Sequence, residues 1–369
     1  MDKQNSFWVE YQVEADDRSD AEFKAGLIAV EQSVEMPPDV VPASAQKNIG
    51  KVLDITQIES DKWSVKINYQ VDLFDGDITQ FLNILFGNIS LQPWCRLLNT
   101  DTAILNTSFQ GPAFGTTGIR KLLNVDERAL SCAVIKPIGA SSDELSGMAH
   151  QFASGGIDII KDDHGLTDQK SAPFKERVIK CVQAVRSGEQ HTGKKTLYFP
   201  NITVSPFKVK ERFEQAAELG ADGVLIAPQL VGLETLHELT KSGTLPIMAH
   251  PTFSGSYLIN KSGVDPAFYF GKLTRSLGAD AIIYPNADGR FSFTTDLCKK
   301  INRSCREKRG GHLPALPAPG GGVRLETIPG LVRSYGSDTL FLIGGSLFKQ
   351  GDIKNAAMNF QQALENYEQ

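Results

Sequence analysis

The chain has 369 residues, 41% of them hydrophobic and 22% charged, with a formal net charge of −5. It is long enough for two globular domains, and its negative balance gives no long-range attraction for a nucleic acid. No segment approaches the roughly 18 apolar residues that span a bilayer, and the first residues lack a signal-peptide core, so we expect a cytoplasmic protein without a membrane partner.

The first third of the chain predicts a small α+β domain. Three segments alternate with the period of a strand: 7–13, 51–58 and 63–71. The spacing of apolar residues over 21–34 predicts a helix between the first two strands. A second helix should begin after Asp77, with Gln80 three residues later, and end at Gly87. Strand, helix, hairpin and helix predict a ferredoxin-like domain over residues 1–119.

The remainder, residues 120–369, predicts a (β/α)₈ barrel. Eight short apolar runs each precede a helical segment: 131–136, 157–161, 196–201, 222–228, 245–250, 279–285, 313–319 and 339–345. Eight such units in roughly 250 residues match a barrel of this class, whose active site lies at the carboxyl ends of the strands. A doubly wound open sheet is the alternative fold.

The strongest local signal is the run 155–164, which delivers Lys161, Asp162, Asp163 and His164 to one strand end. Alternate residues of a strand share a side, so Lys161 and Asp163 should point the same way. Mg²⁺ prefers oxygen ligands and would be repelled by an ammonium, so Lys161 can join a metal site only as a carbamate formed with CO₂. The alternative is a lysine paired with neighbouring aspartates.

Two further strand ends carry candidate catalytic side chains. Lys136 ends the first barrel strand and should point into the same mouth as Lys161. Two ammonium groups in a partly desolvated pocket disfavour each other, which makes one lysine a candidate base; a solvated lysine is the alternative. His250 ends the fifth strand as an acid, a base or a hydrogen-bond donor, unless it is structural.

Two glycine clusters follow the last two strands, and they predict a phosphate site. The residues concerned are Gly320, Gly321, Gly322, Gly344 and Gly345. In barrels of this class, bare backbone N–H groups of these two loops approach a phosphate closely.

These segments together resemble the large subunit of RubisCO and its RubisCO-like relatives over nearly the whole chain. The motifs are A-V-E-Q-S near residue 30, L-F-x10-L-F-G-N at 73–88, F-Q-G-P at 109–112, I-K-P at 135–137, G-G-I-D-I-I-K-D-D at 155–163, M-A-H at 248–250, G-G-G-V-R at 320–324 and I-G-G-S at 343–346. They stand in the order and at the spacings of that family.

The resemblance implies a role for each matched residue. Lys161 matches the carbamylated lysine, Asp163 the aspartate that binds Mg²⁺, and Lys136 the proton-abstracting lysine. His250 matches the active-site histidine. The other matches are Gly322, Gly344 and Gly345, which donate to one phosphate, with Gly321 beside them, and Asn88 and Glu31, which in the family reach the site of a partner subunit. A homodimer with a shared active site is therefore implied.

Departures from the family narrow the expected chemistry. His164 stands where a glutamate ligand is expected, and imidazole suits Mg²⁺ less well than a carboxylate. Pro251 and Tyr284 stand at the arginine and histidine that hold a second phosphate, so we expect a singly phosphorylated substrate. The loop 286–291 is short and lacks the family's lysine, for which Arg290 is the candidate substitute. The loss of this lysine disfavours carboxylation.

The expected activity is lyase or isomerase chemistry through a Mg²⁺-stabilised enolate. The D-D-H-G-L segment at 162–166 resembles enzymes that decarboxylate or cleave a 3-oxo-sugar-acid phosphate such as 3-oxo-isoapionate 4-phosphate. Two methionine-salvage activities are the alternatives: 2,3-diketo-5-methylthiopentyl-1-phosphate enolase and methylthioribulose-phosphate isomerase. A non-catalytic barrel is the alternative of another class.

Overall fold

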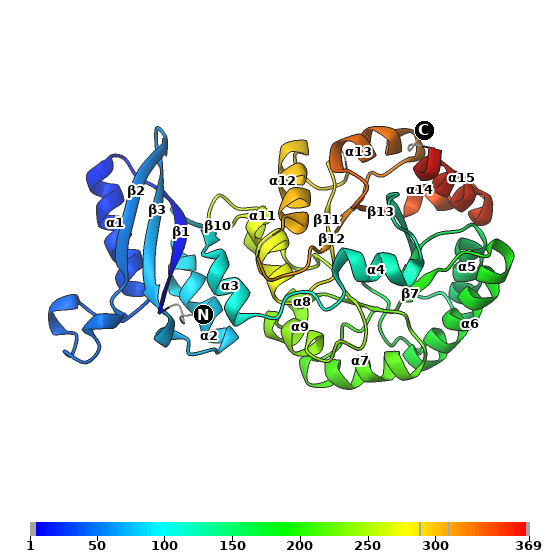
Figure 1. Cartoon of the computed structure of the whole chain (residues 1–369), viewed down its shortest axis with the longest axis horizontal. Helices are drawn as coiled ribbons and strands as arrows, with labels where there is room; N and C mark the ends of the chain where they lie inside the picture. Colours follow the sequence, from blue (N-terminus) through cyan, green and yellow to red (C-terminus); the bar gives the residue numbers. More distant parts are fainter. Residues whose placement is uncertain (1–4, 288, 309, 367–369) are drawn as a thin grey trace. The chain divides into compact units, whose positions relative to one another are not determined.

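The computed structural model describes residues 5–287, 289–308 and 310–366. The chain divides into two compact units (Figure 1). The N-terminal unit comprises Met1–Phe109 and Ser254–Tyr269, and the barrel unit comprises Gln110–Phe253 and Phe270–Gln369. Among the described residues, no helix combines the length and the apolar character needed to cross a membrane.

The N-terminal unit is built on a five-stranded sheet in the order β10-β4-β1-β3-β2. Its elements are β1 (Ser6–Glu14), α1 (Arg18–Glu31), β2 (Lys51–Glu59), β3 (Lys62–Gln70), α2 (Ile78–Phe86), β4 (Cys95–Thr100), α3 (Thr102–Ser108), α10 (Gly255–Leu258), β10 (Gly263–Val264) and α11 (Pro266–Phe268). The predicted α+β class, its first three strands and both helices are confirmed. The sequence patterns did not predict β4 or β10.

Alternation along the strands explains why helices cover one face of this sheet. In β1 and β3 every second side chain is buried, and these side chains include Val9, Tyr11 and Ile67. The helix α2 begins as expected, because the Asp77 carboxylate accepts a hydrogen bond from the backbone N–H of Gln80 at 2.7 Å. The Tyr11 hydroxyl donates to the carbonyl of Leu85 at 2.9 Å and ties α2 to the sheet.

The barrel unit holds eight parallel strands in the order β7-β6-β5-β13-β12-β11-β9-β8. A parallel bridge between Asn201 and Leu225 closes the ring between β7 and β8. The strands are β5 (Leu130–Ile135), β6 (Ile159–Asp162), β7 (Leu197–Phe199), β8 (Val224–Ile226), β9 (Ile247–Ala249), β11 (Ala281–Pro285), β12 (Leu316–Gly320) and β13 (Leu340–Ile343). Each of the eight predicted runs overlaps one of these strands, so the predicted barrel is confirmed.

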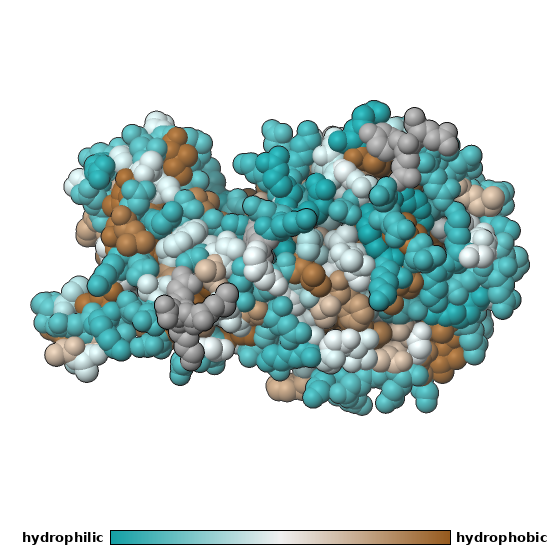
Figure 2. All heavy atoms as spheres, in the orientation of Figure 1, coloured by the Kyte–Doolittle hydropathy of each residue, from teal (hydrophilic) through white to brown (hydrophobic). Residues whose placement is uncertain are grey.

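Helices before, between and after the barrel strands surround the ring (Figure 1). They are α4 (Gly115–Leu123), α5 (Ser142–Ser154), α6 (Phe174–Thr192), α7 (Val209–Glu218), α8 (Pro228–Val231), α9 (Leu233–Thr240), α12 (Thr295–Arg306), α13 (Ile328–Tyr335), α14 (Gly345–Phe348) and α15 (Ile353–Glu365). Hydrophilic residues cover most of the face shown in Figure 2, and hydrophobic ones form separate small patches there. The apolar side chains instead gather inside the ring.

The two units meet in sequence at residues 109/110, ten residues before the predicted boundary at 119/120. The helix α4 groups with the barrel because Ile119 and Leu123 are part of the barrel core. The segment Ser254–Tyr269, which the prediction assigned to the barrel, groups with the N-terminal unit because β10 pairs in parallel with β4.

Candidate active site

Strand alternation decides which side chains face the mouth of the barrel. Cys132 of β5, Ile159 of β6 and Met248 of β9 lie in the core inside the ring. Residues an even number further along the same strands point the same way. Lys136, four residues after Cys132, and Lys161 and His250, each two residues after a core residue, therefore face the carboxyl-terminal mouth.

Lys161 is buried, with only 2% of its surface exposed. Its ammonium donates to the carbonyl oxygen of Asp162 at 3.0 Å. Burial lowers the pKa of Lys161, with a further lowering from the charge of Lys136, against the opposing effect of Cys132 and of the neighbouring aspartates. A lysine shifted in this direction holds more of the neutral amine, which is the form that reacts with CO₂.

Asp163 and His164 lie beside Lys161 and contact each other. His164 Nδ1 is 3.0 Å from Asp163 Oδ1. Burial alone would raise the pKa of Asp163, but the hydrogen bond from His164 and the charge of Lys161 outweigh it and lower the pKa to about 2. The carboxylate is therefore ionised at neutral pH and is available as a ligand or an electrostatic partner.

His250 packs face to face on His164, with ring centroids 4.4 Å apart and planes inclined by 18°. Burial lowers the pKa of His250 well below its ordinary value, and the charges of Lys161 and His164 act in the same direction. His250 is therefore neutral at pH 7. Its Nδ1 contacts Thr252, through the backbone nitrogen at 3.1 Å and through Oγ1 at 2.7 Å.

The donor set fits Mg²⁺ on one condition. Among the described residues, no three His, Cys, Asp or Glu side chains gather closely enough to hold a metal ion. Asp163 and His164 supply two donors on adjacent residues, and a carbamate on Lys161 would add the oxygen ligands that a hard cation requires. The residues therefore fit the ion only when Lys161 is modified.

The glycine loops lie at the same end of the barrel. A Cβ placed on Gly344 would lie 3.6 Å from Nζ of Lys136, which places this amine beside the loop after β13. In the loop after β12, Gly321 and Gly322 have φ angles of +88° and +74°, a conformation that favours glycine. No atom lies within 4 Å of a Cβ placed on Gly321 or on Gly345, so both backbones are open to a ligand.

Glu31 and Asn88 come together within the N-terminal unit. The Asn88 amide donates to Glu31 at 3.0 Å and to Glu35 at 2.8 Å. No sequence pattern marked Glu35, which lies four residues after Glu31 and beyond the end of α1. The amide thus holds two carboxylates together on an exposed part of the unit.

Behind the strand wall, Asp162 anchors a network that sequence reasoning missed. Its buried carboxylate accepts the Tyr198 hydroxyl at 2.7 Å, the backbone N–H of Asn201 at 3.0 Å and the Arg177 guanidinium at 3.1 Å. Arg177 also donates to the carbonyl of Thr167 at 2.7 Å. The only signal in the sequence was the doubled aspartate at the strand end.

Asn201 extends this network to the loop that carries the candidate ligands. Its amide donates to the carbonyl of His164 at 2.8 Å and to that of Leu166 at 3.0 Å. These two hydrogen bonds hold the backbone of that loop in place.

The expected position of Tyr284 was wrong. Ala281 and Ile283 of β11 lie in the core inside the ring, so Tyr284 points outward. Its fully buried hydroxyl has a pKa raised by burial and by the nearby Cys305, on α12. The residue that faces the mouth is Pro285, which has no group to hold a second phosphate.

Arg290, the candidate substitute for the family's lysine, is exposed and lies 5.9 Å from the Phe291 ring centroid. Residue 288 of this loop lies outside the described residues.

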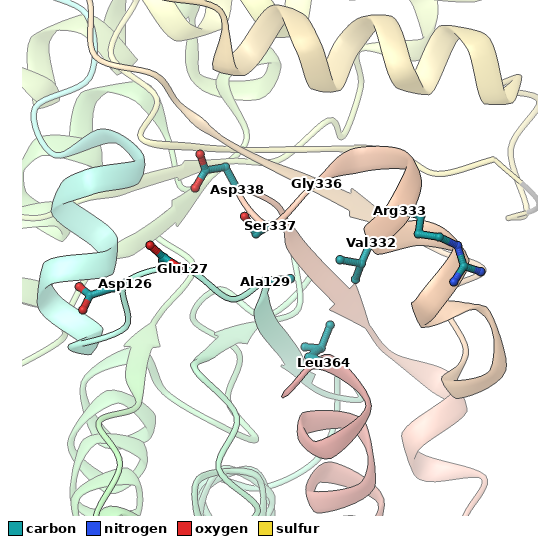
Figure 3. Close-up of a pocket in the computed structure, with 9 residues that line it drawn as sticks. All are labelled: Asp126, Glu127, Ala129, Val332, Arg333, Gly336, Ser337, Asp338 and Leu364. Carbon is teal, nitrogen blue, oxygen red and sulfur yellow. The ribbon is translucent and has the colours of Figure 1, made fainter. Parts of the chain in front are cut away.

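A cavity of about 860 Å³ lies at the other end of the barrel, where β5 and β13 begin (Figure 3). It is lined by Asp126, Glu127, Ala129, Val332, Arg333, Gly336, Ser337, Asp338 and Leu364. Its three carboxylates make it unsuitable for a phosphate, and none of the predicted site residues lines it.

Comparison with known proteins gives the family. The model of the ribulose bisphosphate carboxylase large chain catalytic domain matches residues 115–368, and that of the N-terminal domain matches residues 1–95. A 5-methylthioribulose-1-phosphate isomerase from Rhodospirillum rubrum is 38% identical, over 90% of this chain and 88% of its own. A 2,3-diketo-5-methylthiopentyl-1-phosphate enolase from Geobacillus thermodenitrificans is 34% identical, over 78% of this chain and 71% of its own.

The fold agrees with this assignment. The crystal structure of a Rubisco-like protein from Rhodopseudomonas palustris superimposes with a TM-score of 0.90 at 33% identity, and the match covers 100% of this chain and 99% of that one. The chain therefore belongs to the RuBisCO large-chain family, among its RubisCO-like proteins.

Proposed function

We propose that the protein is an isomerase that acts on a singly phosphorylated ketose through an enolate, with 5-methylthioribulose 1-phosphate as the first substrate to test. One observation carries the proposal: the Lys136 amine lies beside the glycine loop of Gly344, at the mouth that Lys161 and His250 also face. Such a site can hold a phosphate and act on the carbon atoms next to it.

The residues at the mouth of the barrel have separate proposed roles. The backbones of Gly321, Gly322, Gly344 and Gly345 hold the phosphate. Lys136, as a free amine, removes a proton from a carbon beside the ketone and returns it to a neighbouring carbon, which completes an isomerisation. The intermediate carries negative charge on the former ketone oxygen, which the cationic and hydrogen-bonding groups of the mouth stabilise.

The proposed cofactor is Mg²⁺, held by carbamylated Lys161, Asp163 and His164. When bound, such an ion polarises the ketone as a Lewis acid. Burial favours the neutral amine of Lys161 that forms the carbamate, and Asp163 stays ionised beside it.

We propose further that the active unit is a homodimer with a shared site. The support is the family resemblance of Glu31 and Asn88, whose counterparts reach a partner subunit. Their side chains are already held together by the Asn88 amide, with Glu35 as a third member.

Decarboxylation of a 3-oxo-sugar-acid phosphate is a second candidate. His164, in place of a glutamate, removes one negative charge from the mouth beside Asp163 and so favours a substrate that carries a carboxylate next to its ketone. Neither relative named above carries this activity, which places it second.

The test is a parallel assay with Mg²⁺ and bicarbonate, followed by ¹H and ³¹P NMR. The four substrates are 5-methylthioribulose 1-phosphate, 2,3-diketo-5-methylthiopentyl 1-phosphate, 3-oxo-isoapionate 4-phosphate and ribulose bisphosphate. An isomeric sugar phosphate from the first supports the proposal, and CO₂ release from the third supports the second candidate. Turnover of ribulose bisphosphate alone, with CO₂ fixed, would contradict both.

A further inference from the structure

The contacts of His250 decide between the three roles that its position allows. The backbone N–H of Thr252 donates to His250 Nδ1 over 3.1 Å. A backbone nitrogen has a proton to give and no lone pair to offer, so it can only be the donor. Nδ1 must therefore carry a free lone pair and no proton.

The state of the other ring nitrogen follows. A neutral imidazole carries one proton, and since Nδ1 has none, Nε2 carries it. Among the described residues no hydrogen bond joins Nε2, and Nε2 is not one of the buried polar atoms without a partner. The Nε2–H group is therefore open to the mouth that His250 faces.

We propose that His250 is a fixed hydrogen-bond donor to the substrate oxygen that becomes the enolate oxygen, and that Thr252 is the positioning residue that holds it in this state. This inference rests on the proposed function for the identity of the acceptor. A ring whose Nε2 is protonated and whose Nδ1 is occupied can act neither as a base nor as a metal ligand toward the mouth.

The hydroxyl of Thr252 strengthens the arrangement. Its Oγ1 lies 2.7 Å from Nδ1, closer than the backbone nitrogen. With Nδ1 unprotonated, the hydroxyl is also a donor. The stacking of His250 on the His164 ring, with centroids 4.4 Å apart, fixes the plane of the ring. Thr252 and His164 together leave the Nε2–H one direction in which to point.

The direct test is ¹⁵N NMR of protein labelled at histidine, with the His250 signals assigned by their loss in His250→Gln. The expected spectrum at pH 8 shows a pyridine-type Nδ1 and a protonated Nε2. In Thr252→Val the Nδ1 signal should move toward that of a nitrogen with one fewer hydrogen bond, whereas Thr252→Ser should keep the wild-type position. A protonated Nδ1 in the wild type would overturn the proposal.

Activity variants give an independent test, because side-chain amides imitate single ring nitrogens. In His250→Gln the amide N–H stands near the place of Nε2–H, and in His250→Asn it stands near Nδ1. We expect proton exchange in His250→Gln within about tenfold of wild type and in His250→Asn reduced by about 10²–10³, the usual effect of losing one oxyanion donor. Equal losses in both variants would contradict a donor role.

Different results would refute the proposed function and the proposed role of His250. If no substrate exchanges protons, the proposed function fails, and the NMR spectrum still decides the state of His250. If exchange occurs but Nδ1 carries the proton, the proposed function stands and the role of Thr252 is refuted.

Discussion

Asp162 and Asp163 are adjacent in the chain, yet their carboxylates serve opposite sides of the barrel wall. Asp162 is fully buried against Arg177 and Tyr198, whereas Asp163 is partly exposed and contacts His164. Strand alternation produces this division, because successive side chains point to opposite faces. The Asp162 carboxylate holds the loop in place, and the Asp163 carboxylate remains available as a ligand or an electrostatic partner.

The buried pair predicts a large stability effect. Both side chains of the Arg177–Asp162 pair have 0% exposure, so Arg177→Met would leave an unpaired buried carboxylate and cost about 3–5 kcal/mol. Urea unfolding measures this cost. Arg18→Met is the matched control, since the Arg18–Glu22 pair is 67% and 53% exposed and its loss should change stability little. Similar small effects in both variants would refute the anchoring role.

The lowered pKa of Asp163 predicts an acid-dependent contribution to stability. Its folded pKa of about 2 lies below the ordinary value of 3.8, so the unfolded chain binds more protons between these values. The contribution is present above about pH 4 and is lost as the pH falls through about 2. Asp163→Asn removes it, so the difference in unfolding free energy between wild type and variant should change by about 2 kcal/mol over this window. A pH-independent difference would count against the assignment.

Gly344→Ala tests the phosphate loop. The new methyl group would lie 3.6 Å from Lys136 Nζ, in the space where amine and phosphate should meet. We expect inorganic phosphate to bind at least about tenfold more weakly, as measured by calorimetry, because a change of about 1.4 kcal/mol corresponds to that factor. Gly330→Ala is the control, since a Cβ there has no atom within 4 Å. Unchanged phosphate affinity in Gly344→Ala would place the phosphate elsewhere.

Mixing two inactive variants tests the shared site. If Asn88 of one subunit serves the barrel of the other, a dimer of Lys136→Ala with Asn88→Ala contains one intact site. Random reassociation should then restore about a quarter of the wild-type rate. Remixing each variant with itself is the control. No recovery in a mixture with demonstrated subunit exchange would mean that each chain completes its own site.

The sequence predicted most of the barrel because hydrophobic runs repeated eight times leave little choice of fold. It also placed Lys161, Asp163 and His250 at strand ends. In the structure these side chains face the mouth of the barrel, because each lies an even number of residues after a core residue such as Met248. The helix start at Asp77 followed from local chemistry and is confirmed.

Other features depend on contacts between distant segments and left no local pattern. The strand β10 has two residues and exists through its pairing with β4. The predicted direction of the Tyr284 side chain was wrong because successive side chains of a strand point to opposite faces, so an alignment shifted by one residue reverses the assignment. The Thr252 contact to His250 needs coordinates, since nothing in the M-A-H-P-T sequence specifies which ring nitrogen is occupied.

The most direct test of the account is incorporation of solvent deuterium into 5-methylthioribulose 1-phosphate, followed by ¹H NMR in D₂O with Mg²⁺ and bicarbonate, for wild type and for Lys136→Met. We predict exchange at a carbon beside the ketone in the wild type, and a loss of at least about 10² in the variant, the usual contribution of a general base. Exchange that persists in Lys136→Met at the wild-type rate would contradict the role of this amine and the mechanism built on it.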